Sequence, residues 1–461
     1  MSLNYVDFVA SKLSTVPPTG MSGFSLPGSL FKHQSALTAW ALRRGRAAIF
    51  ADTGLGKARM SLSWADAVHR YTKRPVLMLE PPAVGWQMSK EGEAIGVSAH
   101  ICRDGADVRE GINVTNYERL HRFNPTDFAG VVLGESSCIK HHDAKTFRAL
   151  TEAFAETEFK LPESATPAPN DWTELGTHAE FLGICTRQEM LAEYFTHDGG
   201  DTSVWRLKGH ARQQFWRWVA TWGAMVRRPS DLGFDDSAYL LPALHLHEHH
   251  VEVEMPTNGM LFALEAKTLS ERREARRTSM EDRVRECAKR VSAEPGQPWI
   301  IWCDLNDESD ALTRSIEGAM EVRGSMDLEE KEDRLRAFSE GKARVIVTKP
   351  SIAGHGLNWQ HAARMAFVGV TDSYEAYYQA VRRIWRFGQK RDCHVHIFAS
   401  KAEGAVVANL KRKEREAAQM AEALSAETRD AVMTEVTGLR RQTNSHDAGH
   451  AVNVPNFLRT A

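Results

Sequence analysis

The sequence predicts an α/β fold made of two parallel sheets, each flanked by helices. Two successive regions of similar size alternate short apolar runs with amphipathic stretches, which is the pattern of parallel strands joined by helices. A turn-forming stretch, RRPSDLGF at 227–234, separates the two regions. The 461 residues are enough for two or three domains with buried cores. We therefore expect two sheet domains that face one another.

In the first region, the stretch 33–44 has helical periodicity and stops at Gly45, a residue that favours helix ends. A short apolar run at 47–52 reads as a strand, and 58–71 reads as an amphipathic helix. Further apolar runs predict strands at 75–80, 111–116 and 130–135. The segment 186–228 is rich in tryptophan and is predicted to be mostly helical.

The second region begins with a strand in LHLHEHHVEVEM (244–255), and a charged helix is expected near 260–292. Four apolar runs then predict strands at 298–304, 343–349, 364–370 and 393–400. Beyond about residue 402 the pattern is helical and charged, and from about 440 it is polar.

The composition is that of an ordinary globular protein, with 42% hydrophobic and 26% charged residues. The net charge of -2 means that any nucleic-acid surface must be a local basic patch. The six cysteines form no CxxC pair, which argues against a zinc site or a disulfide framework and favours a reducing compartment. No signal peptide or membrane span is visible, so we expect a cytoplasmic protein.

The stretch ADTGLGKA (51–58) lies between a predicted strand and a predicted helix, which is the context of a phosphate-binding loop. Thr53, Gly54 and Gly56, with Leu55 between the glycines, allow the backbone amides to wrap an anion. Lys57 would reach the β- and γ-phosphates. The alternative is a glycine turn that only starts a core helix.

A second stretch, VVLGESS (131–137), is an apolar strand that ends in a carboxylate. In ATPases with a phosphate-binding loop, carboxylates at such a strand end hold magnesium and polarise water. Gly134 stands where an aspartate is expected, and Glu135 remains. Ala58 likewise replaces the hydroxyl residue that normally follows the loop lysine. Both missing groups would serve one Mg²⁺ ion, so we expect ATP to bind but hydrolysis to be slow.

A third stretch, YYQAVRRIWRFGQKR (377–391), places Gln379, Arg383 and Arg386 at positions i, i+4 and i+7 of a predicted helix, on one face. The planar fork of arginine suits a phosphate better than lysine does. The alternative is a solvated basic helix face.

Together these stretches resemble the Swi/Snf-type branch of the superfamily-two helicase-like ATPases, in particular the compact versions found in phage and prophage genomes. The resemblance runs from about residue 31 to residue 400. It includes FKHQ (31–34), VLMLEPPAVGWQ (76–87), VTNYERL (114–120), SATPAPN (164–170), IIWCDLNDE (300–308) and TKPSIAGHGLNWQ (348–360). All stand in the family's order, between or beside the three stretches described above.

The resemblance implies two RecA-like lobes with a helical insertion and a helical C-terminal tail. The expected division is an arm at 1–30, an ATP-binding lobe at 31–235 with the helical segment 186–228, a second lobe at 236–420 and a tail at 421–461. It also implies catalytic roles for Glu135, Gln379, Arg383 and Arg386, with both arginines acting as fingers on the γ-phosphate. The implied nucleotide-binding residues are Gln34, which contacts adenine, and Thr53, Gly54, Leu55, Gly56, Lys57, Ala58, Gly354 and Gly356.

The implied activity is an ATP-dependent, Mg²⁺-requiring motor that is stimulated by nucleic acid and tracks along double-stranded DNA. The alternative is a weak or inactive ATPase that binds DNA, or a phage or host protein, as a clamp or inhibitor. No membrane partner is expected.

Three further features each allow two interpretations. The histidines His245, His247 and His249 could bind zinc or could belong to a half-exposed strand. The tryptophans could stack on bases, although packing in a helical core between the lobes is favoured. These are Trp205, Trp216, Trp218 and Trp222. The basic stretch 271–290, with Arg272, Arg273, Arg276 and Arg277, could contact DNA phosphates or be a solvated helix, and 409–417 is similar.

Overall fold

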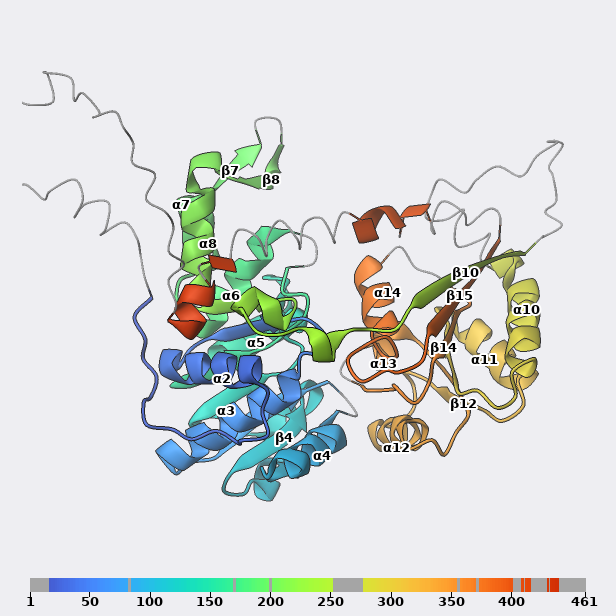
Figure 1. Cartoon of the computed structure of the whole chain (residues 1–461), viewed down its shortest axis with the longest axis horizontal. Helices are drawn as coiled ribbons and strands as arrows, with labels where there is room; N and C mark the ends of the chain where they lie inside the picture. The colour runs from blue at the N-terminus through green and yellow to red at the C-terminus, as the bar shows by residue number, and fades with distance from the viewer. Residues whose placement is uncertain are drawn as a thin grey trace, which may run out of the picture.

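The computed structural model describes residues 16–81, 84–168, 171–198, 201–251, 277–354, 357–369, 373–400, 408–409, 411–415, 429–430 and 432–438. Figure 1 shows two lobes joined by an extended connection that leads into β10. Each lobe is a parallel sheet flanked by helices, so the predicted fold class of two RecA-like lobes is confirmed. In the described part of the chain, no helix is long and apolar enough to cross a membrane.

Lobe 1 contains one continuous parallel sheet. Its strands are β1 (Ala48–Ala51), β2 (Val76–Glu80), β3 (Ala99–Ile101), β4 (Ile112–Asn116), β5 (Gly130–Leu133), β6 (Phe159–Pro162) and β9 (Gly223–Val226). Five of them pair in the order β3-β4-β2-β5-β6. Two isolated bridges, Arg46 to Lys160 and Ile49 to Glu163, continue the sheet from β6 to β1, which pairs with β9. All these pairings are parallel.

The strand order explains why these segments are so apolar. β1, β2, β4, β5, β6 and β9 are buried along their whole length, as expected for parallel strands covered by helices on both faces. The flanking helices of lobe 1 are α2 (Lys32–Arg44), α3 (Lys57–Thr72), α4 (Gly85–Ile95), α5 (Lys145–Ala153), α6 (Leu175–Leu182), α7 (Arg187–Tyr194) and α8 (Arg212–Ala220). α2 ends at Gly45, as predicted, with a φ of 77°.

The segment 186–228 is less helical than predicted. α7 is followed by an antiparallel hairpin, β7 (Phe195–Asp198) and β8 (Asp201–Leu207), and α8 is followed by β9. β9 belongs to the main sheet because it pairs in parallel with β1. Trp216, Trp218 and Trp222 are buried in the core of lobe 1, and Trp205 packs partly against it. Core packing is therefore confirmed, but this core lies within lobe 1 and not between the lobes.

Lobe 2 is built on a six-stranded parallel sheet in the order β10-β15-β14-β11-β13-β12. Its strands are β10 (Leu244–Val251), β11 (Trp299–Trp302), β12 (Ala319–Val322), β13 (Val345–Thr348), β14 (Arg364–Phe367) and β15 (Cys393–Ser400). Its helices are α10 (Met280–Ser292), α11 (Asn306–Ser315), α12 (Leu328–Ser339), α13 (Pro350–Ala353) and α14 (Tyr374–Val381). α10 accounts for the C-terminal part of the predicted charged helix. The rest of that helix, with Arg272, Arg273 and Arg276, lies outside the described residues.

The C-terminal stretch (429–430 and 432–438) returns to lobe 1. Val432 and Val436 are buried in the same core cluster as α2 and α3, and Glu435 forms an ion pair with Arg44 of α2. Figure 1 shows this short helix against lobe 1, far from the end of β15. The chain therefore connects the two lobes once through the segment before β10 and again through its C-terminal part.

Side chains of the two lobes also contact each other directly. The Tyr378 hydroxyl donates to Asp52 Oδ1 at 2.8 Å, and the backbone amide of Asn358 donates to Gln87 Oε1 at 3.2 Å. Lys140 and Glu375 form an ion pair between the lobes. These contacts hold the carboxyl-terminal edges of the two sheets close together, and the candidate site lies between them.

Candidate active site

The glycine-rich loop connects β1 to α3 in the conformation that a phosphate-binding loop requires. Gly54 and Gly56 have φ values of 90° and 85°, which side chains larger than glycine rarely adopt. α3 begins at Lys57, so its free backbone amides and the positive end of its dipole face the loop. The Lys57 ammonium donates to the Ala51 carbonyl at 2.9 Å, which folds its side chain back over the loop.

Gln34 and three aromatic rings define one end of the site. Gln34 Nε2 donates to the Leu55 carbonyl at 3.0 Å, and its Oε1 accepts from the Phe31 amide. The Phe31 ring lies edge-on to Phe387 of lobe 2, with centroids 6.0 Å apart. Tyr239 lies 4.5 Å from Phe387, centroid to centroid. An amide beside aromatic rings suits a purine base, so this end can hold the adenine of a nucleotide.

Three glutamates lie at the ends of adjacent strands on the opposite side of the loop. Glu80 ends β2, Glu135 follows β5 and Glu163 follows β6, and these strands are neighbours in the sheet. Glu135 has a φ of 54°, a left-handed conformation that is rare for a non-glycine residue. Its Oε1 accepts a hydrogen bond of 3.1 Å from Ser164. Glu80 and Glu163 are each only 4% exposed.

The environment of these glutamates is unfavourable for negative charge. Burial raises the pKa of Glu80 well above its usual value, and the charges of Glu163 and Glu135 raise it further. Burial also raises the pKa of Glu163 to about 7, although Lys57 acts in the opposite direction. One oxygen of each buried carboxylate, Glu80 Oε1 and Glu163 Oε2, has no hydrogen-bond partner.

Lobe 2 contributes the buried Arg383 and the half-buried Arg386, but not from a continuous helix as predicted. α14 ends at Val381, so only Gln379 of the three predicted residues lies on it. The Arg383 carbonyl accepts from the Trp359 amide at 3.0 Å, and the chain then turns irregularly toward Gly388, whose φ is 90°. The Arg383 and Ile384 amides donate to carbonyls only three residues back, those of Ala380 and Val381, so the α-helical pattern gives way to tighter turns.

Both guanidinium groups are held on backbone carbonyls. Arg383 Nη1 and Arg386 Nη1 donate to the Leu357 carbonyl, at 2.7 Å and 3.3 Å. Burial lowers the pKa of Arg383 to about 9, and the nearby Arg386 charge lowers it further. Burial lowers the pKa of Arg386 to about 10. Buried cations of this kind favour an anionic ligand such as a phosphate.

A chain of hydrogen bonds links the lobe 1 carboxylate to the lobe 2 arginine. Ser164 Oγ donates to Glu135 and accepts from the Thr166 amide at 3.0 Å. Thr166 Oγ1 accepts from Gln379 Nε2 at 3.3 Å. Gln379 Oε1 then accepts from Arg383 Nη2 at 3.2 Å. Glu135 and Arg383 are therefore linked through hydrogen bonds of Ser164, Thr166 and Gln379.

Most of the predicted site residues meet around one cavity of about 360 Å³ between the lobes. They are Gln34, Thr53, Gly54, Gly56, Lys57, Ala58, Glu135, Arg383 and Arg386. Leu55 is instead buried in the core, and Gln379 is buried behind Arg383. Gly354 does not line the cavity, whereas Asn358 and Gln360 from the same motif do. Gly356 lies outside the described residues.

Several lining residues were not predicted. Phe31, Phe387, Glu80 and Glu163 line the same cavity. Glu80 lies within the stretch 76–87 and Glu163 directly precedes the stretch 164–170, but only the strand order shows that both lie beside Glu135. Phe31 and Phe387 could have been suspected, because each lies within a motif that the sequence analysis singles out.

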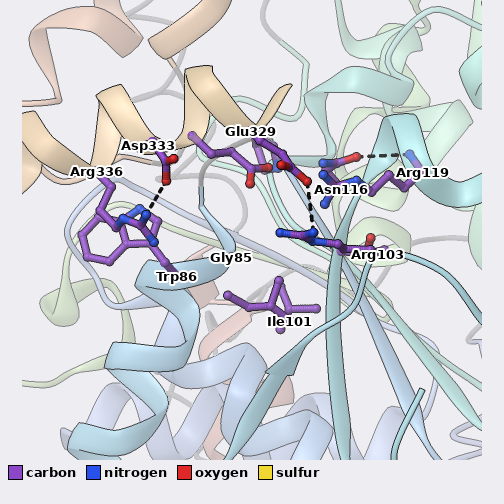
Figure 2. A pocket seen from close by; sticks show the side chains of 13 residues that line it. Gly85, Trp86, Ile101, Arg103, Asn116, Arg119, Glu329, Asp333 and Arg336 are labelled. Atoms are coloured by element: carbon purple, nitrogen blue, oxygen red, sulfur yellow. Dashed lines mark hydrogen bonds and ion pairs between the residues drawn. The ribbon is translucent and has the colours of Figure 1, made fainter. Parts of the chain in front are cut away.

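A second cavity, of about 220 Å³, separates the lobes near α12 (Figure 2). Trp86, Arg103 and Arg119 come from lobe 1, and the acidic residues Glu329 and Asp333 face them from α12. Arg103 and Glu329 form an ion pair of 3.0 Å between side chains that are largely exposed, so the pair adds little stability. The stretches 76–87 and 114–120, which contain Trp86 and Arg119, therefore both line this second cavity.

The histidines of β10 form a stack rather than a metal site. His247 Nε2 lies 2.9 Å from His394 Nδ1, and His249 Nε2 lies 2.9 Å from His396 Nδ1 on the neighbouring β15. Among the described residues, no group of three or more histidine, cysteine, aspartate or glutamate side chains is arranged to hold a metal by itself. All six cysteines are free, in line with the prediction of no disulfide framework.

Comparison with known proteins identifies part of the chain. Residues 282–388 match the helicase conserved C-terminal domain. This part of lobe 2 is therefore similar to a helicase C-terminal domain. The matched region runs from α10 to Gly388 and includes Arg383 and Arg386. The expected resemblance to helicase-like ATPases is confirmed for this lobe.

No curated protein sequence matches the chain significantly. Among solved structures, the chain is similar to the SWI2/SNF2 ATPase core of Sulfolobus solfataricus, a structure in complex with double-stranded DNA. The two share 16% sequence identity with a TM-score of 0.41, over 90% of this chain and 98% of that chain.

Proposed function

We propose that this chain is a Swi/Snf-type ATPase motor that is stimulated by, and moves along, double-stranded DNA. The observation that supports this most strongly is the composition of the main cavity. Its phosphate loop and Glu135 come from lobe 1, and Arg383 and Arg386 come from the helicase domain of lobe 2. A site completed by two lobes couples hydrolysis to lobe closure, and repeated closure is what moves a motor along its track.

The residues present fit ATP. The adenine would lie beside Phe31 and Phe387, close to Gln34, all of which line the cavity. The phosphates would lie over the loop amides and Lys57, with Arg383 and Arg386 on the opposite side. Glu135 would accept the proton of the attacking water or orient it. Both arginines would stabilise the charge that develops on the transferred phosphoryl group.

The residues also fit a divalent cation bound together with the phosphates. Mg²⁺ prefers one or two carboxylates plus phosphate oxygens and water to a cage made only of protein groups. The unpartnered oxygens of Glu80 and Glu163 meet this requirement. When bound, the ion would neutralise negative charge on the phosphates.

We place the DNA on the side of the second cavity. Trp86 and Arg119 belong to motifs that follow strands of lobe 1, and Arg103 adds a third group facing the gap. Contacts of arginines with phosphates would give binding that weakens with salt and has little sequence preference. The acidic face of α12 would have to move away for a duplex to enter, so DNA binding and lobe movement would be linked.

A second candidate function is supported by Ala58 and Gly134. These residues remove two groups that usually orient the metal, and both line or adjoin the main cavity. In this case the chain would bind ATP without turning it over and would act as a clamp on DNA, or on a phage or host protein.

The test is phosphate release at saturating ATP, with and without duplex DNA, for the wild-type chain and Lys57→Ala. The proposed motor releases phosphate faster with DNA, and Lys57→Ala loses this activity. ATP binding with no release under either condition would instead support the clamp. Release that does not respond to DNA would contradict the motor.

A further inference from the structure

The position of Gly134 in the sheet decides which side chain can lie above it. β2 and β5 are parallel neighbours, with Leu79 opposite Leu133. The next residues, Glu80 and Gly134, are therefore adjacent at the edge that faces the cavity. The Gly134 amide donates to the Leu79 carbonyl at 2.8 Å, which continues the pairing to the end of the strand.

The Glu80 carboxyl occupies the space that a side chain at position 134 would need. A Cβ atom built on Gly134 would lie no more than 2.5 Å from each of the three carboxyl atoms of Glu80. Real Cβ atoms essentially never approach other atoms so closely. A residue larger than glycine at 134 would therefore require the Glu80 carboxyl to move from its present position.

The Glu80 side chain is also poised to receive a ligand. It is 4% exposed, it lines the main cavity, and its Oε1 has no hydrogen-bond partner. A buried carboxylate oxygen without a partner costs several kcal/mol unless a proton or a cation satisfies it. Glu163, equally buried and with an unpartnered Oε2, lines the same cavity, and Lys57 is the nearby cation of lobe 1.

We propose that Glu80 supplies the metal-binding carboxylate that is missing at Gly134, so that the site binds a divalent cation together with ATP. The carboxylate has moved by one strand, from the end of β5 to the end of β2. Glutamate is one methylene longer than aspartate, which lets it reach over the neighbouring strand. Glu163 is placed to give a second oxygen, in compensation for the hydroxyl missing at Ala58.

This inference rests on the proposed ATP site and changes the expectation for Gly134. Restoring an aspartate at 134 by itself should not improve metal binding, because it would displace the Glu80 carboxyl and so exchange one carboxylate for another. An aspartate at position 134 should bind the metal only when Glu80 is replaced by a smaller residue in the same variant. The two positions are thus expected to be strongly non-additive.

The test measures the affinity for ATP by calorimetry in Mg²⁺ and in EDTA. The ratio of the two dissociation constants, the metal coupling factor, reports the ion without requiring turnover. Mn²⁺ bound with ATP, followed by electron paramagnetic resonance, gives a second readout that is independent of activity. The variants are Glu80→Gln, Gly134→Asp and Glu80→Ala/Gly134→Asp. Glu93→Gln, an exposed glutamate on α4, is the matched control.

For Glu80→Gln, we expect the metal coupling factor to fall about 10-fold or more, while the affinity in EDTA stays within about 2-fold of wild type or rises. Gly134→Asp alone should not increase the metal coupling factor. The double variant Glu80→Ala/Gly134→Asp should have most of the wild-type coupling factor, and Glu93→Gln should match wild type. The Mn²⁺ signal should follow the same order. Thermal unfolding of each variant checks that it is folded.

Two results would overturn the inference. One is a wild-type coupling factor for Glu80→Gln, which would mean that Glu80 is simply a neutral, protonated group. The other is a clear gain from Gly134→Asp alone. A chain with normal, Glu80-dependent metal coupling but no DNA-stimulated hydrolysis would contradict the proposed motor and leave the inference standing. No binding of ATP at all would overturn both.

Discussion

Glu135 adopts a backbone conformation that glutamate rarely takes. Its φ of 54° and ψ of 56° place it in the left-handed region, directly after β5 and directly before a turn. For an L-residue this conformation costs about 1–2 kcal/mol. The strain is located at the residue that we propose acts on water, and it directs the carboxylate toward Ser164.

We expect this strain to be measurable by substitution. Glu135→Gly should be more stable than Glu135→Ala by about 1 kcal/mol, because only glycine adopts a positive φ without penalty. Both variants should lose phosphate release while still binding ATP. Chemical denaturation of the two variants gives the difference, and equal stabilities would show that position 135 is not strained.

Thr166 allows the connection between the lobes to be tested with a single hydroxyl. Thr166→Val keeps the shape of the side chain but leaves the buried Gln379 amide without its acceptor. Such a loss costs about 1–3 kcal/mol, so we expect the DNA-stimulated kcat to fall about 10-fold or more.

The affinity of the Thr166→Val variant for ATP should change little, since Thr166 does not line the cavity. Thr151→Val is the matched control, because the Thr151 hydroxyl on α5 has no hydrogen-bond partner. A normal kcat in Thr166→Val would mean that the hydrogen-bond chain does not link the two lobes.

At the scale of elements, the histidine stack between β10 and β15 makes the stability of lobe 2 depend on pH. His396 is buried, and burial lowers its pKa to about 3, helped by the charges of His247 and His249. The groups that act on it are His247, His249, His394 and Arg290 of α10. The folded state keeps His396 neutral, whereas the unfolded chain takes up a proton below about pH 6.5.

The free energy of unfolding should therefore fall as the pH falls from 6.5 toward 3, and no further loss from His396 is expected below that. Between pH 7 and pH 5, His396 accounts for about 2 kcal/mol. His396→Phe keeps the flat ring, and we expect it to show a correspondingly smaller loss over this range. Urea unfolding at both pH values measures it. A variant as pH-sensitive as wild type would show that His396 is not responsible.

Strands that form uninterrupted apolar runs could be predicted from the sequence, but several with polar residues among the apolar ones could not. β6 contains Lys160, which is buried and donates to the Phe181 carbonyl at 3.0 Å. A lysine inside a four-residue strand erases the apolar pattern, although its tertiary partner allows it to be buried. The hairpin of β7 and β8 was missed, although its residues are β-prone and a Gly-Gly pair separates the two runs in the sequence.

The residues of the candidate site also fall into those that the sequence predicts and those that it does not. The phosphate loop and the arginines were predictable because each motif is local, and Glu135 was predictable from its strand end. The position of Glu80 beside Gly134 was not, since it depends on which strands are neighbours in the sheet. The early end of α14 was also not predictable, because the helical spacing continues in the sequence, whereas the amides of Arg383 and Ile384 bond only three residues back. The expected domain boundaries remain predictions.

At the scale of the whole molecule, the chain ties its lobes together through the C-terminal stretch. Val432 and Val436 are buried in the core of lobe 1, although the chain reaches them only after leaving lobe 2. A stretch that belongs to both lobes can limit how far they separate. Its attachment depends mainly on these apolar contacts, together with the ion pair of Arg44 and Glu435.

Val436→Asp should release this stretch. Exposing one buried valine forfeits about 1.5–3 kcal/mol, and a buried carboxylate adds to the penalty. We expect faster proteolysis of the C-terminal stretch and a lower free energy of unfolding for lobe 1, whereas Val436→Leu should remain close to wild type. Unchanged proteolysis of Val436→Asp would mean that the docking is not held by this contact.

The central claim is that the two lobes form an ATP-driven motor on double-stranded DNA, and displacement of a third strand from a DNA triplex tests it most directly. The wild-type chain should displace the third strand only when ATP is present, without separating the duplex, and Arg386→Ala should not displace it. Displacement that needs no ATP, or DNA-stimulated hydrolysis that never displaces the strand, would contradict the claim.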